Sequence, residues 1–148
     1  MPSTHLCLDF HVVFSTKERR PLIVPAWRDR LHAYIGGSIR TLGGVPVAIG
    51  GTVDHVHLLL GLRATHRLAD VVREVKVASS KWIHDTVASP GFAWQDGYGA
   101  FTVSPGHVDE VRRYIAVQEE HHRKMTFQEE YVSFLRQHGV EYDERYLW

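Results

Sequence analysis

The sequence predicts a single α+β domain, residues 1–148, built on an antiparallel sheet. Its 148 residues, 44% of them hydrophobic and 23% charged, have the length and composition of one globular domain with a sizeable core. Short β-rich segments alternate with longer segments in which apolar residues recur every three or four positions. In chain order the segments are strand, helix, strand, strand, helix, strand and two further helices. The first six match the ferredoxin-like split βαβ arrangement, to which C-terminal helices are added.

The first half of the chain predicts three strands and one helix. Proline favours the first position of a helix, and Pro25 opens a segment with Trp27 and Leu31 near one face. A glycine pair, Gly43 and Gly44, is a typical end for that helix. We expect strands over residues 6–14, 45–53 and 55–62, a helix over 25–42, and turns over 17–21 and near Val53 and Asp54.

The second half predicts three helices and a short strand. An apolar stripe that includes Val71 and Val75 marks an amphipathic helix. Thr126 and Glu129 have the spacing of a capping box, which opens a last helix that Gly139 closes. We expect helices over residues 67–87 and 105–122, a strand over 99–104, the capped helix after Thr126, and a packed aromatic tail over 142–148.

The predicted sheet has one face that its two helices do not cover. The later helices, a partner subunit or a ligand could cover that face, and the sequence leaves these alternatives open.

Composition and charge restrict the class of protein. With 17 basic and 17 acidic residues the net charge is zero, which argues against a general duplex-coating protein but not against a local basic face. Eleven histidines would add positive charge below about pH 6.5. Cys7 is the single cysteine, so an intramolecular disulfide is excluded and a reducing cytoplasm is expected. No apolar run is long enough to cross a bilayer, and no signal peptide is evident.

Two histidines in the third predicted strand are candidate metal ligands. Side chains alternate along a strand, so His55 and His57 share one face, while Val56 and Leu58 share the other. Neutral imidazoles two residues apart on a strand can point at one divalent metal. The alternative is a pair of polar residues on a solvated sheet face, which is the commoner situation for an isolated His-x-His pattern.

A tyrosine and a glutamine lie one turn apart in the predicted helix over residues 105–122. Four residues advance a helix by about 6 Å and rotate it by about 40°, so Tyr114 and Gln118 share a face. The alternative for Tyr114 is a boundary aromatic with its hydroxyl in water. His121 and His122 could be further metal ligands, although a solvated or phosphate-contacting role is favoured for them.

Basic and aromatic residues outside these motifs predict contact with nucleic acid. A phosphate track could be formed by one face of the second helix together with the basic turn at residues 17–21, and exposed aromatics could stack unpaired bases. The alternatives are a solvated helix face and aromatics in the core. Nucleophile elbows, phosphate-binding P-loops and dinucleotide fingerprints are absent from the sequence. The candidate DNA-binding residues are Arg19, Arg20, Arg73, Lys76, Lys81 and Trp94.

The motifs together resemble the single-tyrosine transposases of small bacterial insertion sequences. Residues 54–59, Asp-His-Val-His-Leu-Leu, resemble their His-hydrophobic-His ("HUH") signature. Three further blocks and a Phe-x-Glu-Glu patch at 127–130 agree in order and spacing, so the resemblance covers nearly the whole chain. Val53 departs from it, because relatives often have proline before the aspartate, and a glycine pair at 36–37 is also unusual. The three further blocks are residues 76–81, 94–104 and 114–122.

The resemblance implies a metal-dependent transposase that cleaves and rejoins single-stranded DNA at element ends, often next to a hairpin. Tyr114 would be the nucleophile that forms a 5′-phosphotyrosine, and His55, His57 and Gln118 would bind Mg²⁺ or Mn²⁺. Family members are homodimers, in which the tyrosine helix of one subunit faces the histidine pair of the other at rest. Whether the site of this chain forms within one subunit or across two stays open. Imidazole ligands generally favour zinc or copper over magnesium. The amide oxygen of Gln118 and the phosphate oxygens of the DNA would therefore have to supply the hard ligands.

Two alternatives to a transposase remain from the sequence. One is a catalytically inactive or domesticated module of the same fold that binds single-stranded nucleic acid without metal. The other is a metal-sensing or structural dimer with no nucleic-acid role, which a flat salt dependence or the absence of oligonucleotide binding would favour.

Overall fold

The structure, a computed structural model, describes residues 3–148 and confirms the predicted α+β fold. Within those residues lies one four-stranded sheet, in the order β2-β3-β1-β4, and all its neighbouring strands are antiparallel. The buried strands β3 and β1 are central, so residues of β3 have neighbours on both sides. The strands are β1 (Asp9–Ser15), β2 (Val45–Gly51), β3 (His55–Gly61) and β4 (Gly99–Val103).

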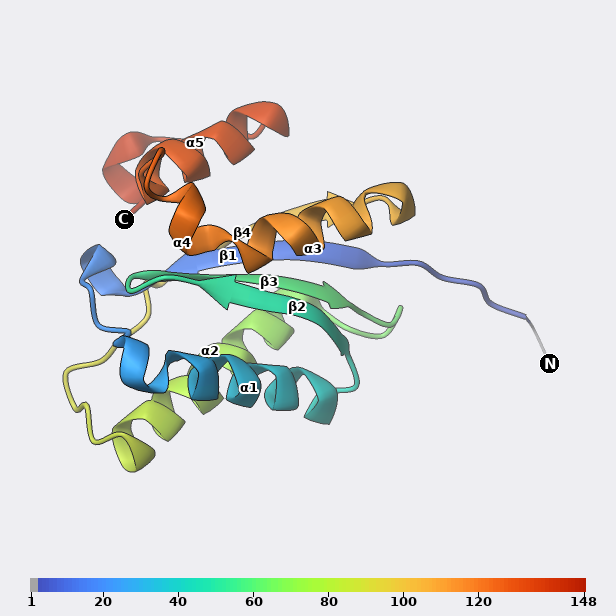
Figure 1. Cartoon of the computed structure of the whole chain (residues 1–148). Coiled ribbons are helices and arrows are strands. Elements are labelled where there is room, and N and C mark those ends of the chain that lie inside the picture. Colours follow the sequence, from blue (N-terminus) through green and yellow to red (C-terminus); the bar gives the residue numbers. More distant parts are fainter. Residues whose placement is uncertain (1–2) are drawn as a thin grey trace.

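One face of the sheet is covered by α1 (Pro25–Thr41) and α2 (Leu68–Thr86), which lie side by side below it in Figure 1. The strands contribute alternate apolar residues to this face, and both helices contribute an apolar stripe. The resulting main core contains, among others, Phe14, Leu31, Ile35, Val56, Leu58, Leu60, Val75 and Ile83.

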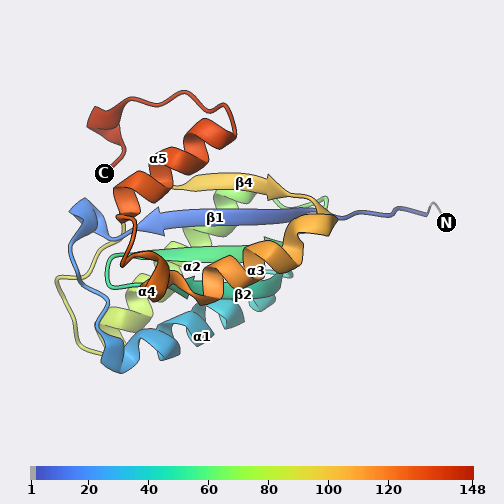
Figure 2. The same cartoon turned by 45° about the horizontal axis from the view of Figure 1, so that its top comes forward.

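The opposite face is covered by the three later helices, α3 (Val108–Ala116), α4 (Gln118–His121) and α5 (Phe127–Gln137) (Figures 1 and 2). Apolar residues of α5 pack on β1 and β4 through a second, smaller cluster that includes Val13 and Phe101. Helix α3 lies over β2 and β3. The sequence left three alternatives for the cover of this face. In the structure the later helices of the same chain cover it.

The predicted continuous helix over residues 105–122 is wrong. The segment is a short 3₁₀ turn, Pro105–His107, followed by α3 and α4, and Val117 between them has φ −111° and ψ 29°. The amide of Val117 reaches back only three residues, to the carbonyl oxygen of Tyr114 at 3.4 Å. The chain therefore turns at Val117, and α4 runs in a different direction from α3 (Figure 2).

The other element ends differ from the predictions by a few residues. The first strand begins at Asp9 rather than at residue 6, because β3 and β4 offer Asp9 its last partners, Gly61 and Val103. Thr126 is confirmed as the cap of the last helix, since its Oγ1 accepts a hydrogen bond from the Glu129 amide at 3.2 Å, and the Glu129 carboxylate accepts from the Thr126 hydroxyl at 3.0 Å. The C-terminal tail packs as expected, with the ring of Trp148 6.0 Å from that of Phe127. Across residues 3–148, the helices are all too short or too polar to span a membrane.

Candidate active site

The site begins with the two histidines of β3. His55 and His57 point to the face that α3, α4 and α5 cover, and both are fully buried. A solvated sheet face, the alternative for this pair, is therefore excluded. The ring of Phe127 from α5 stacks on the ring of His55, with centroids 4.1 Å apart.

Each of these histidines is oriented by a partner at its Nδ1 atom. His55 Nδ1 lies 2.8 Å from a carboxylate oxygen of Asp54. Burial raises the pKa of Asp54, but hydrogen bonds from His55 and Thr52 outweigh it and hold this pKa below its usual range. Because the carboxylate only accepts, His55 Nδ1 carries the proton, and the neutral ring presents the lone pair of Nε2 to the site.

The second histidine is paired with a third one from the neighbouring strand. His57 Nδ1 lies 2.8 Å from Nε2 of His11, which is 3% exposed. Burial lowers the pKa of His57 to about 4 and that of His11 to about 3. Both rings are therefore neutral near pH 7, which is the form in which imidazole binds metals.

Gln118 reaches the same place from the start of α4. Its Oε1 atom lies 3.2 Å from His55 Nε2, and the residue is 2% exposed. Its Nε2 atom donates to the carbonyl oxygen of Tyr114 at 3.4 Å. The side chain thus satisfies the carbonyl that the helix break leaves short of its usual partner, and the same contact directs the amide oxygen toward the histidines. Tyr114 and Gln118 do lie together, but across the break rather than on one continuous helix face.

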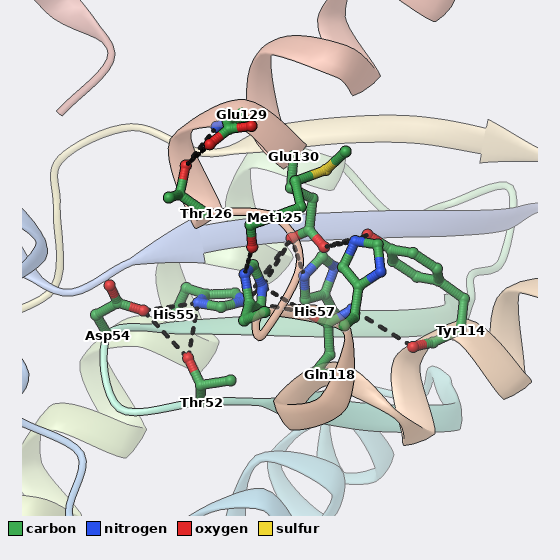
Figure 3. A network of polar contacts seen from close by, with 12 residues as sticks. Thr52, Asp54, His55, His57, Tyr114, Gln118, Met125, Thr126, Glu129 and Glu130 are labelled. Atoms are coloured by element: carbon green, nitrogen blue, oxygen red, sulfur yellow. Dashed lines mark hydrogen bonds and ion pairs between the residues drawn. The ribbon is translucent and has the colours of Figure 1, made fainter.

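The hydroxyl of Tyr114 donates a hydrogen bond to Oε2 of Glu130, a residue of α5 (Figure 3). The same hydroxyl lies 3.1 Å from His121 Nε2. Burial and the Glu130 carboxylate both raise the pKa of Tyr114 above its ordinary value, so the phenol keeps its proton near neutral pH. Any attack by this oxygen therefore needs a neighbouring group to take the proton.

Glu130 itself is 1% exposed and joins the histidines to the tyrosine. Its Oε1 atom lies 2.8 Å from His57 Nε2 and 3.5 Å from His122 Nε2. Burial raises the pKa of Glu130, but the hydrogen bonds from His122, His57 and Tyr114 outweigh it and hold this pKa well below its usual range. Glu130 is therefore ionised, which makes it a hard anionic ligand for a cation.

The cluster of His55, His57, His122 and Glu130 could hold a metal ion. Each residue offers one ligand atom, and these atoms lie within 4.8 Å of one another. Ligands on opposite sides of an ion at metal–ligand distances of about 2.0–2.2 Å are about 4.0–4.4 Å apart, so the cluster needs to contract only slightly. Three imidazole nitrogens with carboxylate and amide oxygens form a donor set that suits a divalent transition metal and, through its oxygens, Mn²⁺ or Mg²⁺.

Comparison with known proteins decides the family. The model of the IS200-like transposase family matches residues 4–118, most of the described chain. The chain belongs to this family. The matched segment contains the histidine pair, Tyr114 and Gln118, and it ends before His122 and Glu130.

Relatives agree with this assignment. The ISDra2 transposase TnpA of Deinococcus radiodurans is 27% identical over 119 residues, which are 75% of this chain and 84% of that protein. A crystal structure from Deinococcus radiodurans R1, described as a transposase, has a TM-score of 0.64 at 28% identity and covers 80% of this chain and 95% of its own. The structure of a REP-associated tyrosine transposase bound to a REP hairpin has a TM-score of 0.57, covers 79% of this chain and 70% of its own, and at 13% identity shares the fold alone.

Two residues of this transposase's site were not assigned to it from the sequence. His122 was given a solvated or phosphate-contacting role, and its Nε2 lies 3.1 Å from His55 Nε2 and 3.0 Å from Gln118 Oε1. Glu130 was noted only in the Phe-x-Glu-Glu patch. A signal for it does exist, because residues 127, 130, 131, 134 and 135 form the inward stripe of α5, and Glu130 is the charged member of that stripe.

Four of the six candidate DNA-binding residues line one pocket of about 680 Å³ beside α2. Helix α2 covers the sheet face opposite to the histidines, so this pocket is separate from the cluster. Arg73 and Lys81 are exposed at its rim. Their charges are paired with acidic neighbours on the same helix, Asp70 and Asp85.

Trp94 and Lys76 are less available than the sequence suggested. Trp94 is 8% exposed, and its indole N–H donates to Ser79 Oγ at 2.9 Å. The rings of Phe14 and Phe92 pack nearly perpendicular to its ring, so base stacking by Trp94 stays a prediction that requires this ring to leave the core. Lys76 donates to the carbonyl oxygens of Gln95 at 2.8 Å and Gly97 at 2.6 Å, and it thereby ties the loop before β4 to α2.

The remaining two candidates lie in the turn after β1. The guanidinium of Arg19 is 4.9 Å from the ring centroid of Trp148, which occupies one of its faces. Arg20 is exposed and paired with Glu18. DNA contact by all six candidate residues stays a prediction.

Proposed function

We propose that this protein is a metal-dependent DNA transposase that cleaves and rejoins single-stranded DNA through a 5′-phosphotyrosine on Tyr114. One observation carries the proposal: the hydroxyl of Tyr114, the two histidines of β3 and the amide of Gln118 converge at one site within one chain (Figure 3). The family assignment supports DNA transposition, and the geometry supports a tyrosine as the reacting group.

The reaction that we propose is attack by Tyr114 Oη on a phosphodiester phosphorus. The Oη–P bond forms, the bond from phosphorus to the 3′ oxygen breaks, and a free 3′-hydroxyl remains. His55, His57 and Gln118 would hold Mg²⁺ or Mn²⁺. When bound, such an ion stabilises the charge that builds on the phosphate oxygens. Because the tyrosine–DNA ester keeps the energy of the phosphodiester, rejoining needs no ATP.

A cleft beside Tyr114 offers a path for the DNA strand. It has a volume of about 580 Å³, lies between β4, α3 and α5, and has Tyr114 and Glu130 in its wall. The partly exposed Phe134 provides apolar surface there, and His107 lies in its wall as an exposed polar group. We infer that the single strand enters here, because aromatic and basic groups beside the nucleophile suit bases and phosphates.

The expected partner is single-stranded DNA that carries a hairpin. The REP-associated relative bound to a REP hairpin supports a hairpin ligand for this fold. Assembly as a homodimer stays a proposal: β2 and β4 are the edge strands of the sheet and are open to pairing with another chain. Gel filtration with light scattering measures the subunit number.

The decisive experiment looks for a covalent protein–DNA adduct. The protein is incubated with labelled single-stranded DNA from the flanks of its own locus, with and without Mn²⁺, and denaturing gels reveal any covalent band. Wild type should form the band only with metal. Tyr114→Phe should lose the band and keep DNA binding, and Tyr146→Phe, at an exposed tyrosine, should keep both. A band with Tyr114→Phe means that another residue is the nucleophile.

A single-strand-binding module without catalysis is the second candidate. One observation favours it: the Tyr114 hydroxyl is held by Glu130, and its pKa is raised rather than lowered. In that case wild type would bind the same oligonucleotides without forming an adduct, and neither Mn²⁺ nor His55→Ala would change the binding.

A further inference from the structure

Glu130 is a buried carboxylate in the apolar stripe of α5. An ionised carboxylate at such a position costs several kcal/mol unless partners compensate for lost water. The two oxygens of Glu130 have separate partners: Oε1 faces His57 and His122, and Oε2 faces Tyr114 and His121. One side chain thus touches both the histidine cluster and the hydroxyl of the tyrosine.

The groups around Glu130 Oε1 include more acceptors than donors. Nδ1–H of His55 donates its hydrogen bond to Asp54, and Nδ1 of His122 lies 2.8 Å from the carbonyl oxygen of Met125, which can only accept. In their neutral forms both rings therefore present Nε2 lone pairs, which are 3.1 Å apart. The side-chain amide oxygen of Gln118, Oε1, points at the Nε2 atoms of His55 and His122.

Such a convergence of lone pairs requires a positive charge among them. A divalent cation placed among these atoms would supply that charge. The position of Glu130 Oε1, 2.8 Å from His57 Nε2 and 3.5 Å from His122 Nε2, places an anionic oxygen at the edge of the same group.

We propose that Glu130 and His122 are additional ligands of the divalent ion, and that Glu130 uses its other oxygen to position the Tyr114 hydroxyl. The ion would then have ligands from three separate parts of the chain: β3, the α4 region and α5. The first half of this inference concerns metal binding alone, whereas the second half rests on the proposed function. It extends the histidine–histidine–glutamine set to residues beyond the family-matched segment 4–118.

The carboxylate of Glu130 would make the ligand set more suitable for Mn²⁺ or Mg²⁺ than imidazoles alone. Imidazoles with one amide oxygen favour softer ions, whereas a carboxylate is a ligand that Mn²⁺ and Mg²⁺ prefer. Glu130 is also the nearest acceptor for the phenolic proton. As the Oη–P bond forms and the P–O3′ bond breaks, that proton moves to Glu130 Oε2, and the departing 3′ oxygen takes a proton from water.

Titration calorimetry with MnCl₂ in the absence of DNA tests the ligand role. Glu130→Gln keeps the size of the side chain but removes the negative charge, on which both the ion and the phenolic proton of Tyr114 would depend. We expect Mn²⁺ affinity to fall at least about tenfold in Glu130→Gln and in His122→Asn. The matched control is Glu141→Gln, at an exposed glutamate, which should stay within about twofold of wild type. Wild-type affinity in folded Glu130→Gln or in folded His122→Asn overturns the ligand assignment of that residue.

Two further measurements separate the possible failures. Circular dichroism with EDTA shows whether each variant is folded, and the partly exposed His122 keeps the test available if Glu130→Gln does not fold. Tyr114→Phe should retain Mn²⁺ affinity within about twofold while it loses the covalent adduct, because the contacts that it removes, to Glu130 Oε2 and His121 Nε2, involve none of the proposed ligand atoms. A wild type that binds Mn²⁺ through Glu130 but forms no adduct contradicts the proposed function and not the ligand assignment, whereas an adduct at full rate in Glu130→Gln contradicts the positioning role.

Discussion

The two faces of the sheet use the same strands, yet only one of them, the polar face, carries buried histidines beside its apolar cluster. Val56, Leu58 and Leu60 of β3 are at most 1% exposed in an apolar core under α1 and α2. His55 and His57 of the same strand are 0% exposed under α3, α4 and α5. Burial by itself therefore does not reveal which face is functional. The difference lies in what each face requires of its cover.

The apolar face requires only volume, because each buried aliphatic side chain contributes about 1.5–3 kcal/mol whatever apolar group it meets. The polar face requires a specific partner for each nitrogen and oxygen, since an unpaired buried polar group costs about 1–3 kcal/mol. Those partners lie far along the chain: Gln118 is 63 residues from His55, and Glu130 is 73 residues from His57. The apolar face therefore stabilises the fold, whereas the contacts of the polar face form only once the chain has folded.

The largest stability effect should come from the apolar face. Leu58→Ala creates a cavity in the main core and should lower the free energy of unfolding by about 3 kcal/mol. Leu6→Ala, at a leucine that is 54% exposed, should change it by less than about 0.5 kcal/mol. Urea unfolding measures both variants. The folded fraction of Leu58→Ala should keep wild-type Mn²⁺ affinity, and a tenfold loss there would show that the two faces are not independent.

A smaller effect on stability should accompany Gly50→Ala, which tests how α3 reaches the polar face. A methyl group at Gly50 would lie 2.4 Å from the backbone oxygen of Ile115, so α3 must move away and carry Tyr114 with it. We expect a loss of about 1–3 kcal/mol and a clear fall in adduct formation.

The control for Gly50→Ala is Gly37→Ala in α1, where the added methyl group meets no atom within 4 Å. This control should be neutral or up to about 1 kcal/mol more stable, because alanine favours a helix interior. Equal adduct yields from Gly50→Ala and wild type would mean that the close approach of α3 is not needed for the reaction.

The last effect is the response to mild acid, which acts on the polar face. Burial lowers the pKa of His11 from 6.5 to about 3 and that of His57 from 6.5 to about 4. Below about pH 6.5, both rings therefore bind protons in the unfolded chain but stay neutral in the folded chain. Stability should therefore fall with decreasing pH. The raised pKa of His122 has the opposite sign and offsets part of this loss. For a net difference of one proton the slope is about 1.4 kcal/mol per pH unit.

Urea unfolding between about pH 7 and about pH 5 measures this slope, and the pKa values above define the window. His11→Gln should flatten the dependence, because it removes one of the two buried rings that titrate only in the unfolded chain. Stability that rises on acidification would show that the charge on His122 dominates.

Much of the fold followed from patterns that are local in the chain. The alternation in β3 placed His55 and His57 on one face, and that holds because side-chain direction in a strand depends only on the backbone. The capping box at Thr126 and the turn near Asp54 are local in the same sense. The helix over residues 105–122 failed because the hydrogen bond from the Gln118 side chain to Tyr114, together with the burial of Gln118, compensates a break that no propensity indicated.

By itself, the sequence determined the order of the elements, the face that each strand residue takes, and the family signature of two histidines, a tyrosine and a glutamine. Only the tertiary structure decided that the chain covers its own polar face, that Trp94 belongs to the core, and that His122 and Glu130 join the histidines. The reason is physical. Strand alternation and helix capping depend on neighbouring residues, whereas a buried charge such as Glu130 is tolerated only where groups from distant segments meet to compensate it.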